Sequence, residues 1–250
     1  PVWHFSLAGV QLKFSAHGSG RGMTIPVRGE GGDWIVKLPD ARFGHVPGNE
    51  FATMRWAKES GIDTPDIRLL DVADVAGLPG QALQMRETTV YAVRRFDRGA
   101  GGQRVHIEDF AQVLGLFPEE KYKRFNYETI ANIVAALVGE SGLREFVRRL
   151  VFIVASGNGD AHHKNWSLIY PDGMQARLSP AYDLVSTIQY MPGDQLALTL
   201  ARSKRWQDVS MEAFLRLARK IGWPEPGMQA MVDEAIEAVL GAWNRAKADV

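Results

Sequence analysis

The sequence of 250 residues changes from strand-like to helix-like patterns near its middle. Before residue 98, short alternations of apolar and polar residues such as "DWIVKLP" lie between turn-rich segments such as "HGSGRG". From about residue 106 the pattern is mostly helical, and residues 142–156 carry apolar side chains at steps of three and four. This segregation predicts an α+β fold with two lobes, a strand-rich lobe over 1–97 and a helical lobe over 98–250.

The pattern also predicts individual elements. A hairpin is expected around "HGSGRG", a strand over 33–39, and a helix that begins at Asn49 as N-cap and ends near Gly61. Strands are also expected at "QALQMRE" and "VYAVRRFD", and two short strands between 165 and 187. Ser210 is a candidate N-cap for the first of two final helices. The last helix has a predicted core stripe of Met228, Met231, Val232, Ala235, Ile236, Val239, Leu240 and Trp243.

The charge balance and the apolar content exclude several classes of protein. Lys and Arg number 29, as do Asp and Glu, so the chain has no net field to attract nucleic acid, and direct nucleic-acid contact is not expected. No apolar run approaches the roughly 20 residues of a membrane span, and the N-terminus does not have the pattern of a signal peptide. With no Cys in the sequence, disulfides and thiolate metal ligands are excluded, and we expect a cytoplasmic protein without membrane contact.

A polar segment follows the helix predicted over 142–156. The segment "SGNGDAHHKNWSLIY" contains Asp160 and, five positions later, Asn165. This D-x-x-x-x-N spacing matches the catalytic loop of protein kinases. Phosphoryl transfer also needs a lysine for nucleotide phosphates, and Lys37 lies in a predicted strand, while Asp183 follows the two predicted short strands. Asn165 and Asp183 offer the hard oxygen ligands that Mg²⁺ prefers. The set therefore favours chemistry on ATP with Mg²⁺, in which Asp160 orients the attacking hydroxyl.

Other interpretations of the same residues stay open. His162 and His163 together with Asp160 could bind Zn²⁺, as in a metal-dependent hydrolase, although adjacent histidines rarely converge on one ion. Glu50 could pair with Lys37, as a helix glutamate does in kinases, or could only favour the start of its helix through the helix dipole.

At these same residues the sequence resembles the HipA family of toxin serine/threonine kinases. Seven stretches carry the resemblance in the order of the family: "SLAGVQLKFSA" (6–16), "WIVKLP" (34–39), "NEFATMRWAKESGI" (49–62), "VRRFDR" (93–98), "HIEDFAQVLG" (106–115), "GNGDAHHKNWSL" (157–168) and "LSPAYDLVST" (178–187).

The resemblance implies a two-lobed protein-kinase-like fold and roles for further residues. Lys37 would contact ATP phosphates, with His162 near them, and Asp160 would be the catalytic base. Asn165 and Asp183 would hold Mg²⁺. Arg94 and Phe96 would meet adenine at the hinge between the lobes. Ser6 would be an autophosphorylated serine at the head of a phosphate-covering loop, with Lys13 near the end of that loop.

The resemblance also implies partners. The substrate would be a protein, possible candidates being aminoacyl-tRNA synthetases, and a small HipB-like DNA-binding antitoxin would bind the toxin. The resemblance begins almost at residue 1, so the small N-terminal subdomain of the family is expected to be cropped, lost or supplied by a separate protein. The competing interpretation is a pseudokinase, which binds nucleotide and acts through a partner without transferring phosphate.

Overall fold

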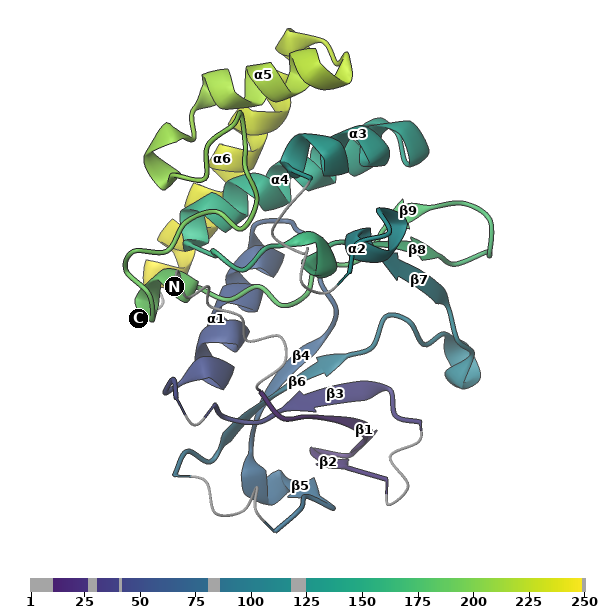
Figure 1. Cartoon of the computed structure of the whole chain (residues 1–250). Helices are drawn as coiled ribbons and strands as arrows, with labels where there is room; N and C mark the ends of the chain where they lie inside the picture. The colour runs from purple at the N-terminus through teal and green to yellow at the C-terminus, as the bar shows by residue number, and fades with distance from the viewer. Residues whose placement is uncertain (1–10, 27–30, 41, 81–85, 118–124, 249–250) are drawn as a thin grey trace.

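The computed structural model of the chain describes residues 11–26, 31–40, 42–80, 86–117 and 125–248. Within these residues a six-stranded sheet forms one end of the molecule and a group of helices forms the other, with a three-stranded sheet beside the helices (Figure 1). The predicted segregation of strands and helices into two lobes is confirmed.

The six-stranded sheet places a row of functional side chains on one face. Its order is β4 (Ile67–Asp71), β6 (Thr89–Arg94), β3 (Trp34–Lys37), β1 (Lys13–Ser19), β2 (Gly22–Thr24) and β5 (Val75–Ala76). In the antiparallel register, Lys37 lies opposite Lys13 on one side and Tyr91 on the other. Because directly opposite residues of neighbouring strands point to the same face, these three side chains form a row across the sheet.

The alternation along β3 assigns its two faces to different surroundings. Trp34 and Val36 are buried in a small core that they share with Ala16, Val90 and other residues of the sheet. The next residue, Lys37, therefore points to the opposite face.

The hairpin of β1 and β2 was predicted correctly, and it turns at Gly20, whose φ of 55° suits a residue without a Cβ.

Helix α1 (Val46–Glu59) lies against this second face and corrects a prediction. The helix begins after His45, with Pro47 in its first turn, where a missing N–H costs no helical hydrogen bond. Asn49 is therefore inside the helix and is not its N-cap, and Glu50 lies beyond the first turn. Glu50 is 1% exposed, so its environment is set by the sheet beneath it rather than by the start of the helix.

Two strand predictions in this lobe need correction. The run "QALQMRE" lies mostly outside the described residues, and its last two residues are not in a strand. The edge strand β4 was missed, since Ile67–Asp71 has no fully buried residue and no clear alternation. The strand predicted at "VYAVRRFD" is present as β6.

The helical lobe contains α2 (Phe110–Val113), α3 (Tyr127–Leu137), α4 (Glu140–Ser156), α5 (Met211–Ile221) and α6 (Glu225–Ala248). Its small sheet has the order β7 (His106–Asp109), β8 (Ser167–Tyr170) and β9 (Arg177–Leu178). The sequence predicted α4 and the strands β8 and β9. It missed β7, which is short and carries two acidic residues.

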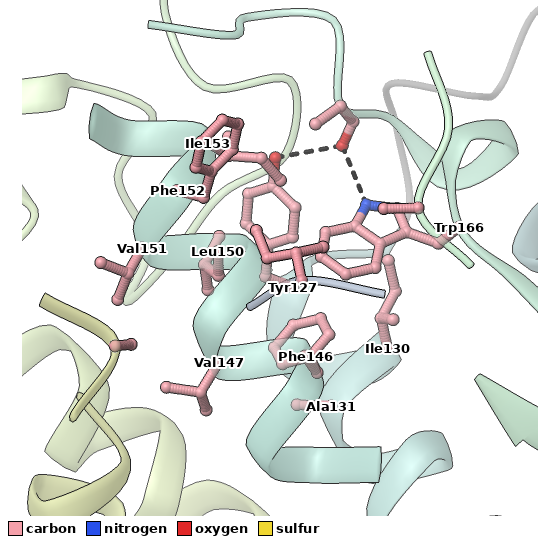
Figure 2. Close-up of a cluster of buried hydrophobic side chains, with 14 of the residues drawn as sticks. Tyr127, Ile130, Ala131, Phe146, Val147, Leu150, Val151, Phe152, Ile153 and Trp166 are labelled. Carbon is pink, nitrogen blue, oxygen red and sulfur yellow. Dashed lines mark hydrogen bonds between the residues drawn. The ribbon is translucent and has the colours of Figure 1, made fainter. Parts of the chain in front are cut away.

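The core of the helical lobe lies around α4. Figure 2 shows Phe146, Leu150 and Tyr127 packed together with the indole of Trp166. The ring centroids of Phe146 and Trp166 are 4.9 Å apart. The hydroxyl of Tyr127 and the indole N–H of Trp166 both donate to the carbonyl of Ala161, at 3.1 and 3.3 Å. The apolar core therefore holds the backbone of the residue that follows Asp160.

The final helices depart from the prediction in two places. Ser210 is at the N-cap position of α5, but its side chain makes no capping hydrogen bond. On α6, Met228, Met231, Val232, Ala235 and Val239 are buried, whereas Ile236, Leu240 and Trp243 are 41%, 52% and 41% exposed. Among the helices of the described residues, none combines the length and the apolar character that crossing a membrane requires.

Candidate active site

Lys37 is a buried cation between two carboxylates from different parts of the chain. Its Nζ donates to Oε1 of Glu50 at 2.5 Å and to Oδ1 of Asp183, which belongs to the helical lobe. The side chains of Lys37 and Glu50 are 6% and 1% exposed. The ring of Tyr91 lies beside the ammonium, with its centroid 5.6 Å from Nζ. The pair of Lys37 and Asp183 therefore joins the two lobes directly.

Burial and charge act in opposite directions on these groups. Burial disfavours the charged ammonium, but the carboxylates of Asp183 and Glu50 outweigh it and raise the pKa of Lys37. Burial likewise disfavours the carboxylate of Asp183, but the charges of Lys37 and Lys13 lower its pKa to about 2. For Glu50 burial dominates and raises the pKa, although Lys37 opposes the rise. Of the two carboxylates, Asp183 is therefore the one whose charged form its surroundings favour.

Asp183 is fixed by a strained backbone and by its neighbour. Its φ is 54°, in the left-handed region that only a few residue types adopt readily. The hydroxyl of Tyr182 donates to the carbonyl of Lys164 at 2.8 Å and lies 2.5 Å from Oγ of Ser167. These contacts tie the Asp183 segment to the loop that contains Asn165, so both predicted metal ligands depend on one local structure.

Asp160 lies in the loop that follows α4. The helix ends at Gly157, which has a φ of 63°, and the side chain of Asn158 accepts a hydrogen bond from the Asp160 N–H at 3.0 Å. The carbonyl of Asp160 accepts from the side-chain amide of Asn165 at 2.9 Å and from the N–H of His162 at 2.7 Å. The D-x-x-x-x-N spacing thus closes a compact loop around the Asp160 backbone.

A small cavity joins the predicted catalytic groups. It has a volume of about 20 Å³, enough for a water, and is lined by Gln11, Lys13, Lys37, Glu50, Asp160, Asp183 and Val185. Its walls come from both lobes. Asp160, Asp183 and Lys37 line the same space. An anionic group of a ligand could therefore bind Lys37 there, and a cation could bind the carboxylates.

A larger cavity of about 270 Å³ adjoins it and shares Lys13, Lys37 and Asp183. Its remaining walls are Ile35, Val93, Arg94, Arg95, Phe96, Asp97, Ile107, Asp109, Gln112, Ser167 and Tyr182. The lining combines apolar side chains with charged groups, and the charged Lys13, Lys37 and Asp183 adjoin the small cavity, which suits a ligand with a flat apolar part and an anionic part. A nucleotide has this division.

The structure places the remaining predicted residues as follows. Phe96 packs on Tyr182 with ring centroids 5.5 Å apart, and Arg94 is largely exposed, with Nη1 3.5 Å from Asp66. Both line the larger cavity.

His162 is fully buried. Its side chain accepts a hydrogen bond from the N–H of Lys164 at 3.2 Å, and its Nε2 lies 3.7 Å from Oδ1 of Asp160. His162 is thus beside Asp160 but does not line either cavity. Ser6 lies outside the described residues.

Asn165, like His162, does not line the small or the larger cavity. It lines a separate, water-sized space with Arg149, Asn158 and Tyr182. Asp160 and Asp183 supply hard carboxylate oxygens that fit Mg²⁺ when phosphate oxygens complete its shell. Within the described residues, no group of three or more His, Cys, Asp or Glu could hold a metal ion, so no zinc cluster is found around His162 and His163 there.

Two residues of the site were missed in the sequence. Gln11 is buried and donates from Nε2 to the carbonyl of Leu38 at 2.7 Å, which closes one side of the small cavity. Tyr91 lies under Lys37, and both carboxylates together with burial raise its pKa, burial most. The alternation of β6 could have placed Tyr91 on the Lys37 face, whereas Gln11 has no such signal.

Comparison with known proteins places the chain among kinase-like relatives. The chain is 46% identical over 247 residues to a Sinorhizobium fredii protein named "Putative kinase Y4dM", which covers 97% of this chain and 60% of that protein. It is 31% identical over 212 residues to the serine/threonine-protein kinase toxin HipA of Shewanella oneidensis, which covers 76% of this chain and 45% of the toxin. The chain therefore spans only part of the length of these relatives.

A solved structure shows the same fold. The chain matches HipA in the Shewanella oneidensis complex of HipA, HipB and operator DNA with a TM-score of 0.75 and 23% identity. The match covers 100% of this chain and 61% of that chain, which confirms the predicted two-lobed kinase-like fold. A family model described as the HipA-like C-terminal domain matches residues 5–243. On this match over nearly its whole length, the chain belongs to the HipA-like C-terminal domain family.

Proposed function

We propose that this chain is the core of an ATP-dependent serine/threonine protein kinase. The observation that carries the proposal is the small cavity in which Lys37, Asp160 and Asp183 meet from two lobes. Phosphoryl transfer needs little covalent chemistry from a protein; it needs a positioned hydroxyl and compensating charge around the phosphates. A cation, a carboxylate for the hydroxyl and a carboxylate for a metal supply these parts.

In the proposed reaction, the oxygen of a protein serine or threonine attacks the γ-phosphorus of ATP. The bond to the β,γ-bridging oxygen breaks, ADP leaves, and Asp160 accepts the hydroxyl proton. Lys37 and Lys13 bind phosphate oxygens, with His162 beside Asp160. Bound Mg²⁺ would neutralise phosphate charge; we assign Asp183 as one ligand and Asn165 as a second, whose side chain would have to turn from its separate space toward the ion.

The base of ATP is proposed to lie in the larger cavity. Phe96 and Arg94 would form the hinge wall against adenine, and the polypeptide would pass between the lobes near residues 97 and 98. Glu50 would keep Lys37 in place for the phosphates. The apolar walls of this cavity and its shared charged end support this orientation.

The relatives also support a proposal about the cellular role and the partners of this chain. We propose a cytoplasmic toxin kinase that phosphorylates a protein, with an aminoacyl-tRNA synthetase as the first candidate, and that autophosphorylates on Ser6. A HipB-like antitoxin, and a separate protein similar to the N-terminal subdomain, are the proposed partners. The structural match of this chain is to a HipA that is bound to HipB and operator DNA.

Intact mass spectrometry after incubation with Mg²⁺-ATP tests the proposal, followed by peptide mapping. The expected result is a gain of one phosphate on Ser6 in the wild-type chain. The Asp183→Asn variant is the matched control and should gain none, because it keeps the backbone shape but loses the metal-binding charge. Equal phosphorylation of both chains would contradict the assigned chemistry.

A nucleotide-binding pseudokinase is the second candidate. The position of Asn165 favours it, because Asn165 lines a space separate from the cavity that Asp160 and Asp183 share. A pseudokinase would show a rise in melting temperature with Mg²⁺-ATP, and no phosphate on the chain or on any added protein. A kinase would show both the rise and the transfer.

A further inference from the structure

Asn49 connects the helix that carries Glu50 to the chain segment that follows Asp183. Its Oδ1 accepts from the N–H of Ser186 at 3.0 Å, and its Nδ2 donates to the carbonyl of the same residue at 3.1 Å. Thr53, one turn along α1, donates to the same Oδ1 at 3.2 Å. One side chain thus satisfies both backbone groups of Ser186, with its own orientation fixed from within the helix.

The next residue of that segment binds the loop of Asp160. Thr187 is fully buried, and its Oγ1 accepts from the N–H of Gly159 at 2.7 Å. The same hydroxyl donates to Oδ2 of Asp194 at 2.6 Å, which directs its lone pairs toward Gly159. The N–H of Ile188 donates to the carbonyl of Gly157 at 3.1 Å. The segment 186–188 is therefore hydrogen-bonded to the loop at Gly157 and at Gly159, the residue directly before Asp160.

The two segments approach too closely for side chains on the loop. A Cβ at Gly157 would lie 2.6 Å from Cγ2 of Ile188, and one at Gly159 would collide with the carboxylate of Asp194. Real Cβ atoms do not approach other atoms this closely, so a side chain at Gly157 would force Ile188 to shift and one at Gly159 would force Asp194 to shift. The contact between Gly157 and Ile188 and the two hydrogen bonds to the loop favour a joint displacement of 186–188 and the loop.

We propose that Asn49 and Thr187 are positioning residues that couple the Lys37 side of the cleft to Asp160. This inference rests on the proposed kinase function. The connection runs from Glu50 through its neighbour Asn49 to Ser186, and from Thr187 to Gly159 and the adjacent Asp160. Lys37 is bound to Glu50 at the start of this path. The group that holds the phosphates and the group that orients the hydroxyl are thereby set in one arrangement.

Hydrogen–deuterium exchange of the full chain tests the connection without requiring activity. Asn49→Ala removes both partners of the half-buried Ser186 backbone, and Thr187→Val removes the partner of the buried Gly159 N–H; each loss is expected to speed exchange in peptides over 157–160 about tenfold. Thr187→Ser keeps the hydroxyl and should restore slow exchange. Arg55→Ala is the matched control on α1, because Arg55 is exposed and pairs only with Glu59 among the contacts described for it.

The decisive variant is Asn49→Ala, which changes a residue that does not touch the loop. Faster exchange at 186–188 together with 157–160 is expected, and faster exchange at 186–188 alone would overturn the coupling. When phosphate transfer to a protein substrate is measured, kcat should fall about tenfold in Asn49→Ala and Thr187→Val. The KM for ATP should stay near that of Arg55→Ala.

The two proposals fail separately. A wild-type chain that transfers no phosphate, but whose loop responds to Asn49→Ala, would overturn the kinase proposal and leave the connection established. A wild-type chain that transfers phosphate, with loop exchange unchanged in Asn49→Ala, would overturn the connection and leave the kinase proposal standing.

Discussion

The loop of Asp160 and the ammonium of Lys37 face the same small cavity but are held in opposite ways. The loop is anchored on apolar packing, because Ala161 accepts hydrogen bonds from Tyr127 and Trp166 inside the core around α4 (Figure 2). Lys37 is held by charge, between Glu50 and Asp183. The first support is built from one lobe, and the second needs both lobes.

Because the two supports differ, substitutions in one should mainly affect the free energy of unfolding and substitutions in the other should mainly affect phosphate transfer. Substitutions in the apolar support should change the free energy of unfolding, because dense cores tolerate lost volume poorly. Substitutions among the charged groups should change phosphate transfer more than stability, because loss of Glu50 or Asp183 still leaves Lys37 paired with the other carboxylate and so avoids an uncompensated buried charge. The predictions below test this separation.

Asp160→Asn should have the largest effect on activity. The amide cannot accept the hydroxyl proton, and loss of a general base typically lowers a rate by about 100- to 10,000-fold. The residue does not line the larger cavity, so the affinity for ATP should stay the same. Initial rates and an ATP titration check both statements. A rate near that of the wild type would remove Asp160 from the chemistry.

Trp166→Ala should have the largest effect on stability. Trp166 is 2% exposed and packs against Phe146, so truncation leaves a cavity and removes one donor to Ala161. The expected loss is about 3–5 kcal/mol in the free energy of unfolding, measured by urea denaturation. Trp166→Phe is the milder control and should lose less. A loss below about 1 kcal/mol would show that the loop does not depend on this core.

Glu50→Gln should lower activity by about tenfold with a smaller change in stability. The amide oxygen can still accept a hydrogen bond from Lys37 but carries no charge, so the ammonium should shift toward Asp183. The exposed Glu234 is the control: it pairs with Arg144 and Arg148 at 2.6 and 2.9 Å, and Glu234→Gln should cost less than about 1 kcal/mol and leave activity unchanged. Equal effects of the two variants on activity would argue against a special role for the buried pair.

The pH dependence of stability should reveal Asp183. Its pKa of about 2 lies below its ordinary value of 3.8, so its stabilising contribution is present above pH 4 and is lost as pH falls toward 2. The contribution of this one group is roughly 2 kcal/mol. Urea denaturation of the wild type and Asp183→Asn between pH 2 and 5 measures it. The difference between the two chains should shrink as the pH falls, and a constant difference would contradict the lowered pKa.

The elements that were predictable from the sequence carry their pattern in consecutive residues. The apolar spacing of α4 predicted a buried helix, and the alternation of β3 predicted the face of Lys37. The order of Lys37, Asp160 and Asp183 along the chain was enough to suggest one cavity. Each of these inferences needed only local periodicity or the chemistry of the side chain.

The errors concern residues whose environment comes from distant parts of the chain. Asn49 has the chemistry of an N-cap, but its amide binds Ser186, which is 137 residues away. Ile236 and Leu240 continue the apolar stripe of α6, yet neighbouring elements cover them only in part, since they are 41% and 52% exposed. The strand β7 exists because β8 pairs with it, and its own residues "HIED" show no strand pattern.

The left-handed backbone at Asp183 limits which side chains the position accepts. Asparagine and aspartate tolerate this conformation, glycine adopts it freely, and β-branched residues are strained there. Asparagine is therefore the replacement that silences the carboxylate while preserving the path of the chain. An evolved or designed variant without the acid at position 183 is therefore expected to have Asn or Gly there, because the backbone conformation favours these residues independently of the reaction in the cleft.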